Sequence, residues 1–424
     1  MNESFVLDAV IEAVPQWYQG SQAPWMDELC LKAERRTICA HIAPSPQLGA
    51  LLCFIKDNLA GWHTFLGNPV SPTRTAALRK AITLEWLRLT DESVDWPLLL
   101  AYMEYLKDRT HENCAVSCNL LIVPEEVKKN TVESGLDTLG TSGKVESSTQ
   151  GGVDITSLHA HKTMDLLANS DRVYFKVDPS LRFLGYEEIS WDQVREAQDY
   201  TYSVDFLHFF SHAVAEGNYL AHLTKQREIV ILGKKGLLAT ERHNRWHVYN
   251  SSALRSSMVD IFADRNVAYN LFELISDLSY KRHGALLVYD PYHTVVKEVI
   301  NRESVFAPEG TPDEVHLMLA PVAEQISLGH SSRGGVKKRI FMEWANLDGA
   351  VIFDADRILA FGAMIRTHPD AGGVVGARTT AALSAYLDGG TTVKISADGD
   401  AYILFSEAEN GGPRTRESAT LQSL

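Results

Sequence analysis

The stretch DGAVIFDADRILAFGAMI, from Asp348 to Ile365, decides the fold of the last third of the chain. Two apolar runs flank a polar segment at Asp354 to Arg357, and this pattern is typical of a β-hairpin. Each run is apolar on both of its faces, so we expect the two strands to lie in the middle of a covered sheet.

The segments around this hairpin extend the same architecture. GALLVYD, from Gly284 to Asp290, predicts a short buried strand that follows a helix over 268–280. VGARTTAALSAYLD, from Val375 to Asp388, predicts a glycine turn that leads into a helix. TTVKISADGDAYILF, from Thr391 to Phe405, predicts a second hairpin. Helices that alternate with strand pairs indicate an α/β fold with a mixed sheet flanked by helices.

The first part of the chain predicts a helix-rich α+β region. Apolar residues recur at helical spacing up to about Leu106, and strand-like runs follow over 115–123 and 173–184. The sequence between these runs is rich in serine, glycine and charged residues, so we expect a disordered loop near 128–160. A further helix comes next, followed by a hairpin over 228–249.

These patterns predict four regions. We expect a helix-rich α+β domain over 1–190, a helix and hairpin extension over 191–265, an α/β domain over 266–408 and a disordered tail over 409–424.

Composition excludes several classes of function. The 424 residues are 45% hydrophobic and 22% charged, which is ordinary for a soluble protein. Lys and Arg number 40 against 54 Asp and Glu, so the net charge of −14 argues against DNA binding. No apolar run reaches the roughly 18 to 20 residues that span a bilayer, and the N-terminus lacks the basic region of a signal peptide. We therefore expect a cytoplasmic protein without a membrane segment. Its five cysteines form no CxxC pair and predict reduced, structural thiols.

Two elements of the last third carry residues suited to a nucleotide. The glycine turn at Gly376 would present free backbone N–H groups and the positive end of a helix dipole to a phosphate. Arg378 adds a forked, permanently charged donor. Asp348 could hold a divalent cation or orient a ribose hydroxyl, and the missing side chain of Gly349 would let a ligand approach closely.

Three motifs, taken in order, resemble the catalytic core of the diadenylate cyclases, the DAC domain, which joins two ATP molecules into cyclic di-AMP. They are GALLV, LDGAVIFDADRILAFGAMI, and GARTTAA followed by KISADGDAYILF. The resemblance covers about Leu271 to Phe405 and implies a DAC-like mixed sheet. It also implies Mg²⁺ or Mn²⁺ bound with the nucleotide, with Asp348 as a metal ligand. The implied nucleotide-binding residues are Asp348, Gly349, Ala350, Gly376, Ala377, Arg378, Thr379, Thr380, Ser396 and Asp398.

The motifs depart from the cyclases where charge is needed. Thr379 and Thr380 stand where the family has His and Arg, and Asp398 is the one carboxylate left in its acidic turn. Phosphoryl transfer depends on charge stabilisation, and the loss of one such arginine can cost several orders of magnitude in rate. We assign no catalytic residue, except Asp348 if the chain is active. An eroded DAC-like core behind a helix-rich extension is similar to the predicted bacterial nucleotide sensors of the DACNV type.

Three functional hypotheses follow. The first is a sensor that binds ATP or a cyclic dinucleotide and signals through its N-terminal region to a downstream protein. The second is an active diadenylate cyclase that works as a homodimer, with Asp348 acting on the ribose hydroxyl. The third is a structural or interaction protein with a DAC-like fold, because a fold does not carry a function with it.

A basic segment, GHSSRGGVKKR from Gly329 to Arg339, precedes the first strand of the hairpin. One interpretation is a solvated loop and helix start. The other is a flap over the triphosphate that replaces the charge missing at Thr379 and Thr380. The flap residues would be Arg333, Lys337, Lys338 and Arg339.

Overall fold

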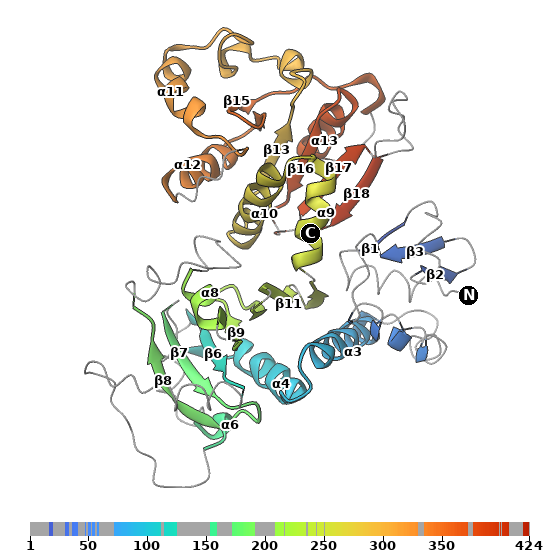
Figure 1. Cartoon of the computed structure of the whole chain (residues 1–424), viewed down its shortest axis with the longest axis vertical. Coiled ribbons are helices and arrows are strands. Elements are labelled where there is room, and N and C mark those ends of the chain that lie inside the picture. Colours follow the sequence, from blue (N-terminus) through green and yellow to red (C-terminus); the bar gives the residue numbers. More distant parts are fainter. Residues whose placement is uncertain are drawn as a thin grey trace. The chain divides into compact units, whose positions relative to one another are not determined.

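The computed structural model divides the chain into two compact units. The first unit comprises 1–15 and 21–252, and the second comprises 16–20 and 253–424. The structure describes residues 17–19, 30–33, 36–40, 47, 50–51, 53–55, 57–58, 72–111, 114–124, 153–158, 172–190, 208–215, 217–234, 236–242, 244–249, 251–329, 335–371, 376–397, 399, 401–406 and 419–423. Each unit contains a mixed sheet with helices beside it (Figure 1), which confirms the predicted α/β class.

The first unit is built on a seven-stranded sheet with the order β12-β11-β10-β9-β6-β7-β8. β6 pairs parallel to β7 and antiparallel to β9. The strands are β6 (Cys118–Ile122), β7 (Val173–Val177), β8 (Phe183–Glu188), β9 (Tyr219–Leu223), β10 (Ile229–Gly233), β11 (Gly236–Arg242) and β12 (Arg245–Val248). The helices are α3 (Pro72–Thr90), α4 (Trp96–Lys107), α6 (Ile155–Leu158) and α8 (His208–Ala215). Shorter strands are β2 (Cys30–Ala33), β3 (Arg36–Ala40), β4 (Thr110–His111) and β5 (Cys114–Ala115). Strand β1 (Trp17–Gln19) belongs to the second unit.

The first unit differs from the prediction in two places. Strands β2 and β3 pair antiparallel inside the stretch that the apolar spacing assigned to helices, because pairing between strands overrides a local periodicity. The four strands β9–β12 lie in the same sheet as β6–β8, whereas the sequence analysis placed them in a separate extension. Most of the loop expected near 128–160 lies outside the described residues.

A half-buried histidine lies in the middle of this sheet, on β9. His222 of β9 lies opposite Asn119 of β6, and its Nδ1 is 2.6 Å from Asn119 Oδ1. The amide nitrogen of Asn119 donates to the carbonyl of Val173 at 2.9 Å, so its oxygen faces the histidine. Burial lowers the pKa of His222 to about 4. The imidazole is therefore neutral in the folded protein at neutral pH.

The second unit is built on a six-stranded sheet with the order β15-β14-β13-β16-β17-β18. β13 and β14 are parallel, and the other neighbours are antiparallel. The strands are β13 (Ala285–Tyr289), β14 (Ala350–Phe353), β15 (Ile358–Ala363), β16 (Thr391–Ile395), β17 (Ala401–Ser406) and β18 (Ala419–Ser423). The α-helices are α9 (Ser251–Phe262), α10 (Arg265–Tyr280), α11 (Glu314–Gln325), α12 (Gly335–Ala345) and α13 (Ala377–Leu387). The short 3₁₀ helices are η4 (Val295–Glu298), η5 (Arg302–Ser304) and η6 (Pro369–Ala371).

Helices cover both faces of this second sheet. Leu286 of β13 belongs to a buried cluster with Ala382 and Ala385 of α13. On the other face, Phe353 of β14 meets Phe341 of α12, with their ring centroids 5.7 Å apart. All four residues of β14 are buried, as the continuous apolar pattern predicts.

The ends of the second unit follow the prediction only in part. The expected turn at Asp354 to Arg357 is present, and the Asp354 side chain accepts hydrogen bonds from two backbone N–H groups of this turn at 2.8 Å. The expectation of a disordered tail from residue 409 is wrong for Ala419–Ser423, because these residues form β18 and pair with β17. Residues 407–418 lie outside the described ranges.

Within the described ranges of the chain, none of the helices combines the length and the apolar character that a bilayer crossing requires.

Candidate functional site

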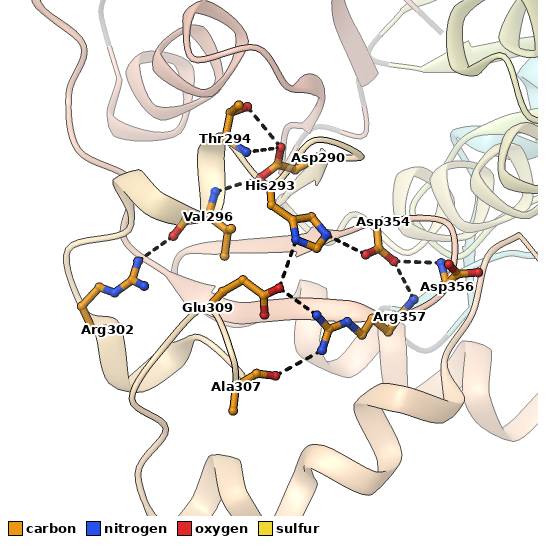
Figure 2. A network of polar contacts seen from close by, with 10 residues as sticks. All are labelled: Asp290, His293, Thr294, Val296, Arg302, Ala307, Glu309, Asp354, Asp356 and Arg357. Carbon is orange, nitrogen blue, oxygen red and sulfur yellow. Dashed lines mark hydrogen bonds and ion pairs between the residues drawn. The ribbon is translucent and has the colours of Figure 1, made fainter.

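The parallel pair β13–β14 has two ends that differ in chemistry. In open α/β sheets, ligands usually bind beyond the carboxyl ends of parallel strands. Here Asp290 follows β13 and Asp354 follows β14 at that end (Figure 2). Asp290 is completely buried and accepts hydrogen bonds from the N–H groups of Thr294 and Val296, both at 2.9 Å. Its carboxylate is thus used to hold the chain after β13.

A connected set of side-chain contacts, which we call the charged ring, occupies the same end, and it is closed by the Arg357 backbone N–H, which donates to Asp354 Oδ1 at 2.8 Å. It consists of Asp354, His293, Glu309 and Arg357. His293 lies between two carboxylates, with Nε2 2.9 Å from Asp354 Oδ2 and Nδ1 3.0 Å from Glu309 Oε1. Arg357 lies 2.8 Å from the same Glu309 oxygen and donates to the carbonyl of Ala307 at 3.1 Å. Figure 2 shows that these side chains point toward one another, so this end of the sheet is closed by the protein's own charges.

The opposite end of the pair is open. Asp348 precedes β14, and 97% of its side chain is exposed. One guanidinium nitrogen of Arg378, Nη2, lies 3.8 Å from Asp348 Oδ1, and 40% of the Arg378 side chain is exposed. The structure therefore brings together the two charged residues that the sequence analysis selected.

The glycine beside Asp348 has a different role from the one predicted. Gly349 has φ +105°, and a Cβ on it would lie 2.4 Å from the backbone carbon of Gly362 in β15. The space that a side chain would need is already filled by the chain itself, so Gly349 is required by the fold and not by a ligand. The next residue, Ala350, is buried in the cluster beneath α13.

The first turn of α13 supplies backbone donors at this open end. Gly376 precedes the helix with φ +101° and has no side chain that could cap it. Thr380 N–H donates to the Gly376 carbonyl at 3.0 Å, which leaves the N–H groups of Ala377, Arg378 and Thr379 without a partner inside the helix. An uncapped helix start without an acidic residue favours an anion.

Arg378 reaches the start of β13 because residue 284 is a glycine. A Cβ on Gly284 would lie 2.5 Å from Arg378 Nη1 and 3.5 Å from the backbone nitrogen of Ala397. The beginning of β13, the end of β16 and the first turn of α13 therefore meet around one guanidinium. Ser396 is half-buried beside Ala397, and Asp398 lies outside the described residues.

Lys394 of β16 is a cation that the sequence analysis missed. Its Nζ donates to Thr379 Oγ1 at 2.8 Å, and it lies 5.4 Å from the centre of the Tyr402 ring. Thr392, two residues earlier, bonds to the Ala382 carbonyl of α13, so both side chains face this helix. Alternation along β16 could have placed Lys394 on the same face as Ser396, but only the sheet register shows which helix covers that face.

The basic segment is only partly described, and its described parts lie elsewhere. Gly329 N–H donates at 2.6 Å to the carbonyl of Ala355, which is in the turn at the closed end of the sheet. Lys338 Nζ lies 2.8 Å from Asp277 Oδ2 of α10, so its ammonium is held there. Arg339 is exposed on α12. The predicted flap residue Arg333 and the side chain of Lys337 lie outside the description.

For the predicted metal ion, this end of the sheet offers one candidate protein ligand. Among the described residues, no three His, Cys, Asp or Glu side chains converge in a way that would hold a metal ion. Asp348 is exposed at the open end and could contribute a carboxylate oxygen. Magnesium in nucleotide sites is commonly held by one or two carboxylates together with phosphate oxygens and water. A cation that arrives with the nucleotide would fit this arrangement.

Two of the solved structures that match part of the chain do so at low sequence identity and low TM-score. No protein-family model matches the chain, and none of the curated proteins does. A crystal structure of DacA from Staphylococcus aureus, a double mutant, is 18% identical; the match covers 34% of this chain and 83% of that one, with a TM-score of 0.20. A hypothetical membrane-spanning protein from Bacillus cereus is 17% identical, and the match covers 40% of this chain and 74% of that one, with a TM-score of 0.21.

Proposed function

We propose that the second unit binds a nucleotide through its phosphates at the open end of the sheet. The observation that carries this proposal is the exposed pair of Asp348 and Arg378 beside the uncapped start of α13. In this proposal the protein is a sensor, which binds ATP or a cyclic dinucleotide and passes the signal through its N-terminal region to another protein. A homodimer and the identity of that protein stay predictions.

The contact between Arg378 and Asp348 is weak enough for Arg378 to exchange Asp348 for a phosphate. The two groups are 3.8 Å apart, the Asp348 side chain is almost fully exposed and that of Arg378 is partly exposed, and such surface pairs contribute little to stability. A phosphate can offer the guanidinium two oxygens in a forked geometry, which is a stronger arrangement. Arg378 would therefore leave Asp348 for a phosphate at low cost, and Asp348 would become available to the cation that accompanies the nucleotide.

Two uncharged residues of α13 support binding without catalysis. Thr380 Oγ1 is hydrogen-bonded to the Gly376 carbonyl at 3.2 Å, and Thr379 Oγ1 accepts from Lys394. Neither side chain can supply the positive charge that stabilises a transferring phosphoryl group. An active cyclase and a pure interaction protein are the alternatives that the following experiments separate.

Replacing Arg378 with alanine should weaken ATP binding at fixed magnesium by about tenfold to a hundredfold. The loss of one charge-assisted contact costs about 1–3 kcal/mol, which corresponds to this range. Isothermal titration of the full chain measures the dissociation constants. Arg366→Ala is the matched control, because Arg366 is an exposed arginine of the same unit that faces Glu298 at 3.7 Å.

Three further results would decide between the hypotheses. Asp348→Asn should remove the magnesium-dependent part of ATP binding and leave the remainder.

Chromatography after incubation with ATP and Mn²⁺ should recover ATP intact. The appearance of cyclic di-AMP would rule out the sensor hypothesis in favour of an active cyclase. If the wild-type chain binds no nucleotide at millimolar concentration, the nucleotide site does not exist and the interaction hypothesis is favoured.

A further inference from the structure

We propose that Lys394 is a second phosphate-binding cation of this site and makes it selective for nucleoside polyphosphates. Nucleoside monophosphates and cyclic dinucleotides would bind more weakly. This inference rests on the proposed function and names the ligand class of the same site. It follows from the position of the Lys394 ammonium relative to Arg378 and to the first turn of α13.

Two cations from different elements meet at one helix turn. Arg378 belongs to α13 itself, whereas Lys394 comes from β16 and reaches the neighbouring residue, Thr379, at 2.8 Å. Arg378 extends toward the start of β13, next to Gly284. Because consecutive residues of a helix point in different directions, the two cations flank the turn and do not share one partner.

The described contacts of the Lys394 ammonium are to uncharged groups. Among the described residues, no carboxylate pairs with its ammonium, whose contacts are the hydroxyl of Thr379 and the ring of Tyr402. A cation at the start of a helix faces the positive end of the helix dipole, which is unfavourable. An anion bound between the ammonium, the guanidinium and the helix N–H groups would relieve this repulsion.

The ammonium of Lys394 is held from two sides, by Thr379 and by Tyr402. Its ammonium lies 5.4 Å from the Tyr402 ring centre, and the residue is half-buried between β17 and α13. A side chain fixed before binding loses little freedom when the ligand arrives, so more of the contact energy appears as affinity. This placement distinguishes Lys394 from an exposed surface lysine such as Lys297.

The spacing of charge decides the ligand class. A polyphosphate chain carries several negative groups next to one another, and it can contact both cations and the helix start at once. A monophosphate offers one group, and a cyclic dinucleotide carries two singly charged phosphodiesters that are separated by sugars. Two cations on either side of one helix turn therefore favour a di- or triphosphate over either of the other ligands.

The test compares four probes on the full chain at fixed magnesium: ATP, inorganic triphosphate, AMP and cyclic di-AMP. For the wild type we expect ATP and triphosphate to bind at least tenfold more tightly than AMP and cyclic di-AMP. Lys394→Met keeps the apolar stem against Tyr402, and it should weaken ATP binding at least tenfold and AMP binding less than threefold. Lys394→Arg should restore most of the ATP affinity, and Lys297→Met is the control for a general loss of charge.

The outcomes separate this inference from the proposed function. If Lys394→Met binds ATP like the wild type while Arg378→Ala does not, Lys394 is a structural residue and this inference is overturned, although the nucleotide site stands. Tighter binding of cyclic di-AMP than of ATP would also overturn it. If the wild type binds none of the probes, the proposed function itself fails. Circular dichroism and a thermal melt show that the methionine variant is folded, so that a loss of affinity can be assigned to the ammonium.

Discussion

Replacing Gly349 with alanine should destabilise the second unit by about 3 kcal/mol or more. A side chain at φ +105° is strained in any surroundings, and the added Cβ would lie 2.4 Å from the backbone of Gly362. The obstacle is main chain and cannot rotate away, so β14 and β15 would have to separate. Chemical denaturation of the full chain, followed by a probe in the second unit, measures the change in the free energy of unfolding.

Gly362→Ala is the matched control for this prediction. Gly362 also has a positive φ, +62°, but a Cβ there would meet only the Asp348 carbonyl oxygen at 3.5 Å, an ordinary contact. We expect a cost of about 1 kcal/mol, from backbone strain alone. Equal destabilisation by the two substitutions would contradict the close approach of β14 and β15 at Gly349.

The first unit should lose about 3 kcal/mol of stability through His222 alone as the pH falls from 7 to 4. Burial lowers the pKa of His222 from 6.5 to about 4, so the unfolded chain binds this proton first. A group with a lowered pKa in the folded state contributes its full stability above pH 6.5. That contribution is lost as the pH falls toward 4. A shift of about 2.5 units corresponds to the stated free energy.

His222→Gln isolates this contribution from that of the carboxylates, which also titrate in acid. Glutamine can still donate to Asn119 but takes up no proton. We expect the variant to be less stable than the wild type at pH 7 and to lose less stability on acidification. Denaturation curves at pH 7, 6, 5 and 4 measure the difference between the two proteins. A difference that stays constant over this range would show that His222 does not titrate below pH 6.5 in the folded state.

Much of the second unit was predictable because its signals are local. A run such as Ala350–Phe353 is apolar on both faces, and this property alone assigns it to a covered sheet. The turn at Asp354 and the glycine before α13 are likewise visible in a few neighbouring residues. The fold class and the elements that bear Asp348 and Arg378 therefore followed from the sequence.

The features that could not be predicted from the sequence depend on strand register and on pairing between strands that are far apart in the chain. Lys394 became a candidate only when β16 was seen to pair with β13 and β17 beneath α13. The role of Gly349 depends on a close approach to Gly362, thirteen residues later, across the hairpin. The apolar pattern could not show that β9 lies beside β6, because 96 residues (123–218) lie between the end of β6 at Ile122 and the start of β9 at Tyr219. Pairings of this kind are a property of the folded chain and not of any short window.

The charged ring has a bearing on how a bound ligand could influence the rest of the molecule. Because His293, Glu309 and Arg357 join three loops at one end of β13 and β14, relative sliding of these strands would break several ion pairs together. A ligand at the other end therefore meets a rigid frame. If binding is coupled to another part of the protein, the elements that change position have to be those attached at the open end. The segment around Asp348 joins α12 to β14, so we expect α12 to be the element whose equilibrium position responds to occupancy.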